Sequence, residues 1–398
     1  MTVTSTPPGI PSPARLENWL REALPREPAV TGEPAVTAEH GQPGEPAVTG
    51  EHGQPGEPAG VRLADVQLIA GGRSNLTYRL AVTGAGPDRL LVLRRPPLGH
   101  VLPTAHDMSR EFRVHSALAG TAVPVARPVA FCADAEVVGA PFYLMDYVPG
   151  VVLRSRQDTA ALTEPQNADL SERLADMLAA IHGVDVAAAG LGTLGRGAGY
   201  LTRQLGRWQR QWELSRTREV PGYDQLVARL TAMLPPEGET TLVHGDFRLD
   251  NLLVTVSPQP RIMAVVDWEM ATLGDPLADL GLTLVYWTDP GEEGWLDPSA
   301  GAGGTHGPQG PGLRADGTTS PGFMTRAEFA AGYARRTGRD ISRIGYYLAF
   351  GYFKLAVVLE GIHARYLKQQ TVGEGFEREG QAVPVLVARA HDVLDADD

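Results

Sequence analysis

The chain has 398 residues, 43% of them hydrophobic, with a formal net charge of -12 at pH 7 and one cysteine, Cys132. This length predicts about two lobes or domains with a sizeable core. The acidic balance excludes nucleic acid or an anionic membrane surface as the main partner. A lone cysteine excludes an internal disulfide, and the first 25 residues show no apolar leader, so we expect a cytoplasmic protein.

Residues 1–60 combine one helix signature with one repeat. Within residues 1–25, a helix is predicted after a tail, with Ser12 as its N-cap and Pro13 in its first turn. Residues 26–60 repeat a unit close to EPAVTGEHGQPG, in which Pro, Gly, Glu and Thr dominate. Such a segment cannot bury enough apolar area to offset the entropy of ordering it, so we predict a disordered insert.

Residues 61–145 are predicted to form a first lobe built on a small sheet. Alternating apolar residues predict strands at 66–70, 75–82, 90–94, 129–132 and 142–145, and helical periodicity predicts a helix at 108–118. Gly71, Gly72 and Ser74 form a turn between the first two strands, just before Asn75. The backbone amides of such a turn can approach a phosphate closely, although most turns of this kind only reverse the chain.

Residues 146–398 are predicted to form a second, mostly helical lobe. Apolar stripes of helical period occupy much of residues 174–234, and a further helix is expected to open at Asp275-Pro276, with Asp275 as its N-cap. Residues 289–322 are rich in Gly, Pro and Asp, which predicts a mobile flap. The apolar run 344–359 is interrupted by Lys354 and is shorter than a membrane span, so we expect a buried helix.

The most informative stretch is HGDFRLDN, residues 244–251, which lies between two apolar β-prone runs. A third such run ends at Asp267, and Asn251 follows Asp246 by five positions. One loop therefore presents an acid and an amide, faced by an acid at a strand end. Such hard oxygen ligands suit Mg²⁺, which prefers one or two carboxylates together with waters and phosphate oxygens.

This stretch resembles the H-x-D-x-x-x-x-N catalytic loop of protein-kinase-like enzymes, in the HGD form of the aminoglycoside phosphotransferase and choline kinase-like family. The resemblance implies an α+β, two-lobed protein-kinase-like fold with a small antiparallel-sheet N-lobe and a larger, mostly helical C-lobe. It also implies an ATP-dependent small-molecule kinase. In that enzyme Asp246 would be the catalytic base, and Asn251 and Asp267 would bind Mg²⁺.

The resemblance assigns nucleotide-binding roles to residues of the first lobe and the link that follows it. Arg94 stands where the family carries a lysine, and it would contact the phosphates and pair with Glu111; the alternative is a solvated arginine pair, Arg94 and Arg95, at a strand end. The backbones of Asp146 and Val148 would bind the adenine edge. The phosphate-covering turn would consist of Gly71, Gly72, Ser74 and Asn75.

The resemblance extends to a subgroup, the phosphotransferase domains found beside acyl-CoA dehydrogenases, through the segments VLRRPP at 92–97, GDPLADL at 274–280 and EGI at 360–362. It implies that Asp275 and Asp279 support the catalytic loop and that the partner is a small metabolite with a hydroxyl group. Two other classes remain open. One is a nucleotide-binding module without turnover, which the arginine at position 94 would explain. The other, ranked last, is a metallohydrolase using His244, Asp246 and Asp267.

Overall fold

The computed structural model of the chain describes residues 7–24, 60–69, 75–84, 87–98, 107–289, 317–369 and 379–397. The predicted repeat insert, apart from Gly60, lies outside these residues, as do positions 290–316 of the predicted flap and the turn residues Gly71, Gly72 and Ser74. The chain divides into two compact units, Met1–Phe112 with Arg127–Tyr147 and Arg113–Ala126 with Val148–Asp398. The division falls within helix α2 (Met108–Leu118).

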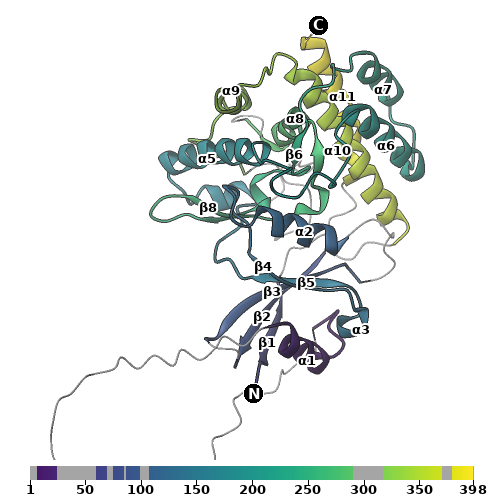
Figure 1. Ribbon diagram of the computed structural model, residues 1–398. Coiled ribbons are helices and arrows are strands. Elements are labelled where there is room, and N and C mark those ends of the chain that lie inside the picture. Colours follow the sequence, from purple (N-terminus) through teal and green to yellow (C-terminus); the bar gives the residue numbers. More distant parts are fainter. Residues whose placement is uncertain are drawn as a thin grey trace, which may run out of the picture. The chain divides into compact units, whose positions relative to one another are not determined.

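The first unit is built on a five-stranded antiparallel sheet with the strand order β1-β2-β3-β5-β4 (Figure 1). Every strand predicted for the first lobe is present, with its ends shifted by a few residues. The strands are β1 (Arg62–Leu68), β2 (Leu76–Thr83), β3 (Arg89–Arg95), β4 (Pro128–Cys132) and β5 (Phe142–Asp146).

One side of this sheet forms the core of the first unit. In β2, Tyr78, Leu80 and Val82 alternate as buried residues, as the period of two side chains in a strand requires. Leu16 and Leu20 of helix α1 (Pro13–Ala23) pack into the same core. Ser12 caps α1 as predicted, and its Oγ accepts the N–H of Arg15 at 3.3 Å. The short helix α3 (Ala135–Val138) contributes two further buried valines.

The second unit is mostly helical. Its helices are α4 (Arg156–Thr159), α5 (Glu164–His182), α6 (Tyr200–Ser215), α7 (Tyr223–Ala232), α8 (Pro276–Tyr286), α9 (Arg326–Thr337), α10 (Ile344–Leu367) and α11 (Glu379–Asp397). The stripe predicted from sequence in helix α6 is buried, including both of its tryptophans, Trp208 and Trp212. Helix α10 is largely buried from Gly345 to Glu360, and it shares one core with residues of α6, α7, α8 and α11.

Two short two-stranded sheets in the second unit flank the loop 244–251. Strand β6 (Thr241–Val243) pairs with β9 (Thr272–Gly274), and β7 (Leu252–Thr255) pairs with β8 (Arg261–Val265), in both cases antiparallel. The loop 244–251 therefore leaves one small sheet and enters the other. In the part of the chain that the structure describes, no helix combines the length and apolar character needed to cross a bilayer.

Candidate active site

The loop that follows β6 depends on Gly245. Its φ of +83° lies in the left-handed region, which glycine adopts without steric cost. A Cβ at this position would lie 2.8 Å from the backbone oxygen of Met270. The middle residue of the His244-Gly245-Asp246 triplet must therefore be glycine if the loop is to lie against η2 (Trp268–Met270).

Asp279, near the start of α8, holds this loop in place. Its carboxylate accepts the backbone N–H of His244 at 2.7 Å and that of Gly245 at 2.8 Å. Burial alone would raise the pKa of Asp279, but the hydrogen bond from His182 and the nearby histidines outweigh it and lower the pKa. The carboxylate is therefore ionised, and the predicted supporting role of Asp279 is confirmed.

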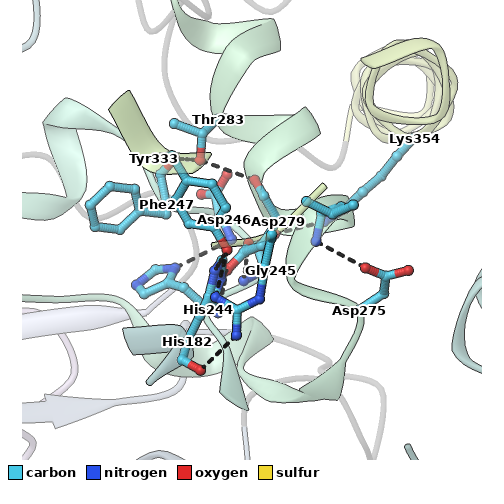
Figure 2. A network of polar contacts seen from close by, with 12 residues as sticks. His182, His244, Gly245, Asp246, Phe247, Asp275, Asp279, Thr283, Tyr333 and Lys354 are labelled. Atoms are coloured by element: carbon cyan, nitrogen blue, oxygen red, sulfur yellow. Dashed lines mark hydrogen bonds and ion pairs between the residues drawn. The ribbon is translucent and has the colours of Figure 1, made fainter. Parts of the chain in front are cut away.

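Behind Asp279 lies a chain of buried hydrogen bonds (Figure 2). His182, at the end of α5, donates from Nε2 to Asp279 at 3.2 Å, and its Nδ1 accepts the Tyr333 hydroxyl at 2.6 Å. Burial lowers the pKa of His182, despite the opposing effect of Asp279, so the imidazole is neutral. Arg339 donates in turn to the Tyr333 hydroxyl at 3.2 Å. Both ring nitrogens of the buried His182 are therefore hydrogen-bonded.

Asp246 and Asn251 are joined directly. The Nδ2 of Asn251 donates to the backbone oxygen of Asp246 at 2.8 Å and to its Oδ2 at 3.0 Å. The 3₁₀ turn Leu249–Asn251 brings the amide back toward the acid. Since both contacts use the amide nitrogen, the Oδ1 of Asn251 has no hydrogen-bond partner among the described residues and is available as a hard oxygen ligand.

Asp267 lies two residues after the end of β8, and its segment is hydrogen-bonded to the same loop. The N–H of Val266, the residue before it, donates to the backbone oxygen of Asn251 at 2.9 Å. Asp267 itself adopts a left-handed conformation, with φ 67° and ψ 57°. The carboxylates of Asp250, Asp246 and Asp267 all act on the guanidinium of Arg248, where they overcome the effect of burial and raise its pKa. Asp246, Asn251 and Asp267 therefore belong to one local cluster.

Three residues near Asp246 were not identified from sequence as site residues. Tyr286 lies at the end of α8, where burial and the nearby charge of Asp246 raise the pKa of Tyr286 well above its ordinary value. The guanidinium of Arg248 lies 4.7 Å from the Tyr286 ring centroid. Lys354 of α10 donates to the backbone oxygen of Gly245 at 2.6 Å. Of these three residues, only Lys354 stood out in the sequence, as a lysine within an apolar run.

In the first unit, Arg94 and Glu111 form the predicted ion pair. The Arg94 Nε lies 3.0 Å from the Glu111 Oε2, and the side chains are 11% and 1% exposed, so the alternative of a solvated arginine pair is wrong. Arg95 faces the other way, where it donates to the backbone oxygens of Gly9 and Val138, and burial lowers its pKa. These contacts settle the register of β3.

The remaining predicted nucleotide-binding residues are only partly described. Asn75 is buried and immediately precedes β2, whereas Gly71, Gly72 and Ser74 lie outside the described residues. At the end of β5, the Asp146 carboxylate contacts Arg89 at 2.8 Å and Arg127 at 2.6 Å. The backbone N–H of Asp146 donates to the Arg127 oxygen at 2.9 Å, which removes that donor from any adenine contact. Val148 is partly buried.

The oxygen ligands that Asn251 and Asp267 offer fit Mg²⁺ better than a metal ion that is coordinated by protein side chains alone. Asn251 and Asp267 offer one amide oxygen and one carboxylate, a set that Mg²⁺ completes with waters and phosphate oxygens. Among the described residues, no three His, Cys, Asp or Glu side chains gather as a metal site would require. Both ring nitrogens of His244 are engaged, Nε2 with the Val266 oxygen at 3.0 Å and Nδ1 with the Asp246 N–H at 3.3 Å. This arrangement counts against the metallohydrolase alternative.

Comparison with known proteins gives consistent matches. Residues 65–315 match the model of the phosphotransferase enzyme family, APH. Acyl-CoA dehydrogenase family member 10 of Mus musculus is 33% identical over 322 residues, which are 81% of this chain but only 28% of the mouse protein. This chain therefore spans less than a third of that relative.

Solved structures show the same relationship in three dimensions. A Ralstonia eutropha protein described as an aminoglycoside phosphotransferase matches with a TM-score of 0.69 at 29% identity, over 96% of this chain and 98% of that one. A mutant of aminoglycoside 2'-phosphotransferase-IIIa, solved with GDP, matches with a TM-score of 0.55 at 17% identity, over 85% and 95% of the two chains. The predicted α+β, protein-kinase-like fold is confirmed, with the sheet unit as its N-lobe and the helical unit as its C-lobe.

Proposed function

We propose that this chain, which belongs to the APH phosphotransferase enzyme family, is an ATP-dependent kinase that phosphorylates a hydroxyl group of a small molecule. The observation that carries the proposal is the Asp246–Asn251 pair. An acid and an amide are fixed side by side on a loop whose backbone is anchored by the buried Asp279 carboxylate. Such fixed geometry is what phosphoryl transfer demands, because catalysis of this reaction rests on positioning and charge stabilisation.

Asp246 is proposed as the base. Its carboxylate would accept the proton of the acceptor hydroxyl while the hydroxyl oxygen attacks the γ-phosphorus and ADP leaves. The hydrogen bond from Asn251 fixes the orientation of the carboxylate before substrate binds.

Asn251 and Asp267 are proposed as the residues that hold Mg²⁺. The bound ion would neutralise the charge of the nucleotide phosphates. In the first unit, Arg94 would contact the phosphates, and its buried pairing with Glu111 would keep the guanidinium in one position. Backbone groups of Gly71, Gly72, Ser74 and Asn75 are proposed to cover the phosphates, and those of Asp146 and Val148 to line the adenine, with the N–H of Asp146 already in use.

The acceptor is proposed to be a metabolite. The name of the mouse relative refers to acyl-CoA dehydrogenases, which favours a hydroxylated acyl compound or another small hydroxyl compound over an antibiotic. A related structure contains GDP, so GTP should be tested beside ATP as the phosphoryl donor.

The test is a screen of small hydroxyl compounds for acceptor-dependent ADP release, with the Asp246→Ala variant beside the wild-type protein. We expect the variant to lose roughly 10²–10⁴-fold in turnover, the usual contribution of a positioned base, while it still binds Mg²⁺–nucleotide. ATP binding by calorimetry with no ATP consumption over the whole screen would instead support a nucleotide-binding module, the alternative that an arginine at position 94 favours.

A further inference from the structure

The chain has 35 lysine and arginine residues, and only two of them are lysines, Lys354 and Lys368. Both belong to the region of helix α10, but their surroundings differ. Lys368 is an exposed residue at the C-cap, whereas Lys354 is partly buried in the apolar middle of the helix. A chain that uses arginine almost everywhere therefore keeps a lysine at one interior position beside the loop that carries Asp246.

The contacts of Lys354 leave much of its ammonium group unused. Figure 2 shows the side chain extending from its helix toward Gly245, and the Nζ donates to the Gly245 oxygen at 2.6 Å. The Nζ also lies 5.6 Å from the ring centroid of Trp208, a favourable position for a cation. An ammonium has three N–H donors, so two of them have no hydrogen-bond partner among the described residues.

A purely structural role does not explain the charge. A neutral amide could donate one hydrogen bond to the Gly245 oxygen without the cost of placing a cation in an apolar helix. Burial lowers the pKa of Lys354, the carboxylates of Asp246 and Asp279 oppose this effect, and Arg207 of α6 adds to it. The ammonium thus lies within electrostatic reach of the proposed base, with two donors to spare.

We propose that Lys354 is a catalytic residue that donates hydrogen bonds to the phosphoryl group during its transfer, an assignment that rests on the proposed kinase function. The acceptor oxygen forms a bond to the γ-phosphorus as the bond from phosphorus to the bridging oxygen of ADP breaks. The electron pair leaves with ADP, and the acceptor proton passes to Asp246. Lys354 keeps its own protons throughout. A cation next to the base is placed to reach the transferring group, because the acceptor oxygen must lie about 3 Å from Asp246.

The first experiment compares Lys354→Met with Lys368→Met, the same substitution in the only other lysine. We expect Lys354→Met to lower kcat by about 10²–10³-fold, the usual effect of removing one donor to transition-state charge, with KM for the nucleotide nearly unchanged. Lys368→Met should match the wild-type protein. Circular dichroism and the Tm of each variant show whether the fold is retained.

A binding measurement separates catalysis from structural support and needs no acceptor. Mg²⁺–ADP with aluminium fluoride mimics the phosphoryl group in transfer, and Mg²⁺–AMP-PNP mimics the ground state. By calorimetry, Lys354→Met should weaken binding of the first by at least roughly tenfold and leave binding of the second unchanged. Equal effects on the two ligands, or no effect on either, would overturn the assignment.

A chemical rescue keeps the inference testable if the methionine variant folds poorly. Cys132 is buried in the first unit, and a Cys132→Ser background leaves the K354C variant with a single thiol. Alkylation of that thiol by 2-bromoethylamine forms a carbon–sulfur bond, releases bromide and restores an ammonium side chain of nearly lysine length. We expect kcat to recover at least roughly tenfold, and a folded, alkylated protein that remains as slow as before would contradict the proposal.

These measurements fail in distinguishable ways. If the wild-type protein never consumes ATP, the kinase proposal is wrong, whatever the lysine variants do. If the wild-type protein turns over and Lys354→Met matches Lys368→Met, the kinase proposal stands and the role of Lys354 is wrong.

Discussion

The Asp279→Asn substitution tests whether a charged carboxylate holds the catalytic loop. In the native protein, one oxygen of Asp279 accepts from Gly245, and the other accepts from His244 and His182. Asparagine has nearly the same shape, but one of its two positions carries an NH₂ group. Either orientation of the amide therefore turns donors toward at least one buried backbone N–H.

The expected cost follows from these contacts. Leaving a buried donor unsatisfied costs about 1–3 kcal/mol, and the remaining hydrogen bonds lose the added strength of a charged acceptor. We therefore expect Asp279→Asn to lower the free energy of unfolding by about 3 kcal/mol. Displacement of the loop by as little as about 1 Å should also lower kcat by roughly 10²-fold.

The measurement is urea unfolding at pH 7, with Asp275→Asn as the matched control on the same helix. Asp275 is buried too, where it caps α8 through the Leu277 N–H at 2.9 Å and accepts the Tyr347 hydroxyl at 2.8 Å. Burial raises the pKa of Asp275, and asparagine is an equally good N-cap, so the control should change stability by less than about 1 kcal/mol. If the two variants proved equally stable, the argument that Asp279 anchors the loop as an anion would fail.

Three further predictions concern separate parts of the site. Glu111→Gln removes the ion pair of the buried Arg94 and should lower the free energy of unfolding in urea by about 3 kcal/mol. Asp65→Asn, which removes the exposed partner of another ion pair, should lower it by less than about 1 kcal/mol. Similar losses in the two variants would contradict the buried pairing. Asn251→Ala should raise the Mg²⁺ concentration for half-maximal nucleotide binding at least roughly tenfold, and an unchanged Mg²⁺ titration would exclude the amide as a ligand. Burial holds the pKa of His182 below 6.5, so as the pH falls below that value the imidazole gains a proton in the unfolded state but not in the native one, and the free energy of unfolding declines. His182→Gln should flatten this decline. If the free energy of unfolding fell with pH equally steeply in both proteins between pH 6.5 and 5.5, His182 would not titrate on unfolding.

The sequence alone predicted the features that depend on contacts between residues close together in the chain. Alternation placed Tyr78, Leu80 and Val82 in the core of the sheet, and the Ser12 cap marked the first turn of α1. The five-residue spacing of Asp246 and Asn251 brought their side chains together, because the intervening 3₁₀ turn reverses the chain within that span. These features depend on neighbours a few residues away.

Features that depend on distant contacts were not predictable in the same way. Lys354 and Gly245 are 109 positions apart in sequence, and no periodicity links them. The hydrogen bond between the Asp146 N–H and the Arg127 oxygen depends on how β4 pairs with β5. Helix α11 was not predicted either, because Pro384 lies within it and proline disfavours a helix interior. Its burial of Val383, Leu386 and Val387 against α10 offsets that cost.

The left-handed backbone of Asp267 limits which residues this position can accept. Most side chains pay roughly 1–2 kcal/mol in that conformation, while Gly, Asn and Asp tolerate it. Of the two acidic amino acids, only aspartate can therefore present a carboxylate here without distorting the turn. Glutamate, the chemically closest replacement, should therefore be tolerated less well at position 267 than asparagine or glycine. The backbone conformation, and not only metal binding, limits which residues can occupy this position.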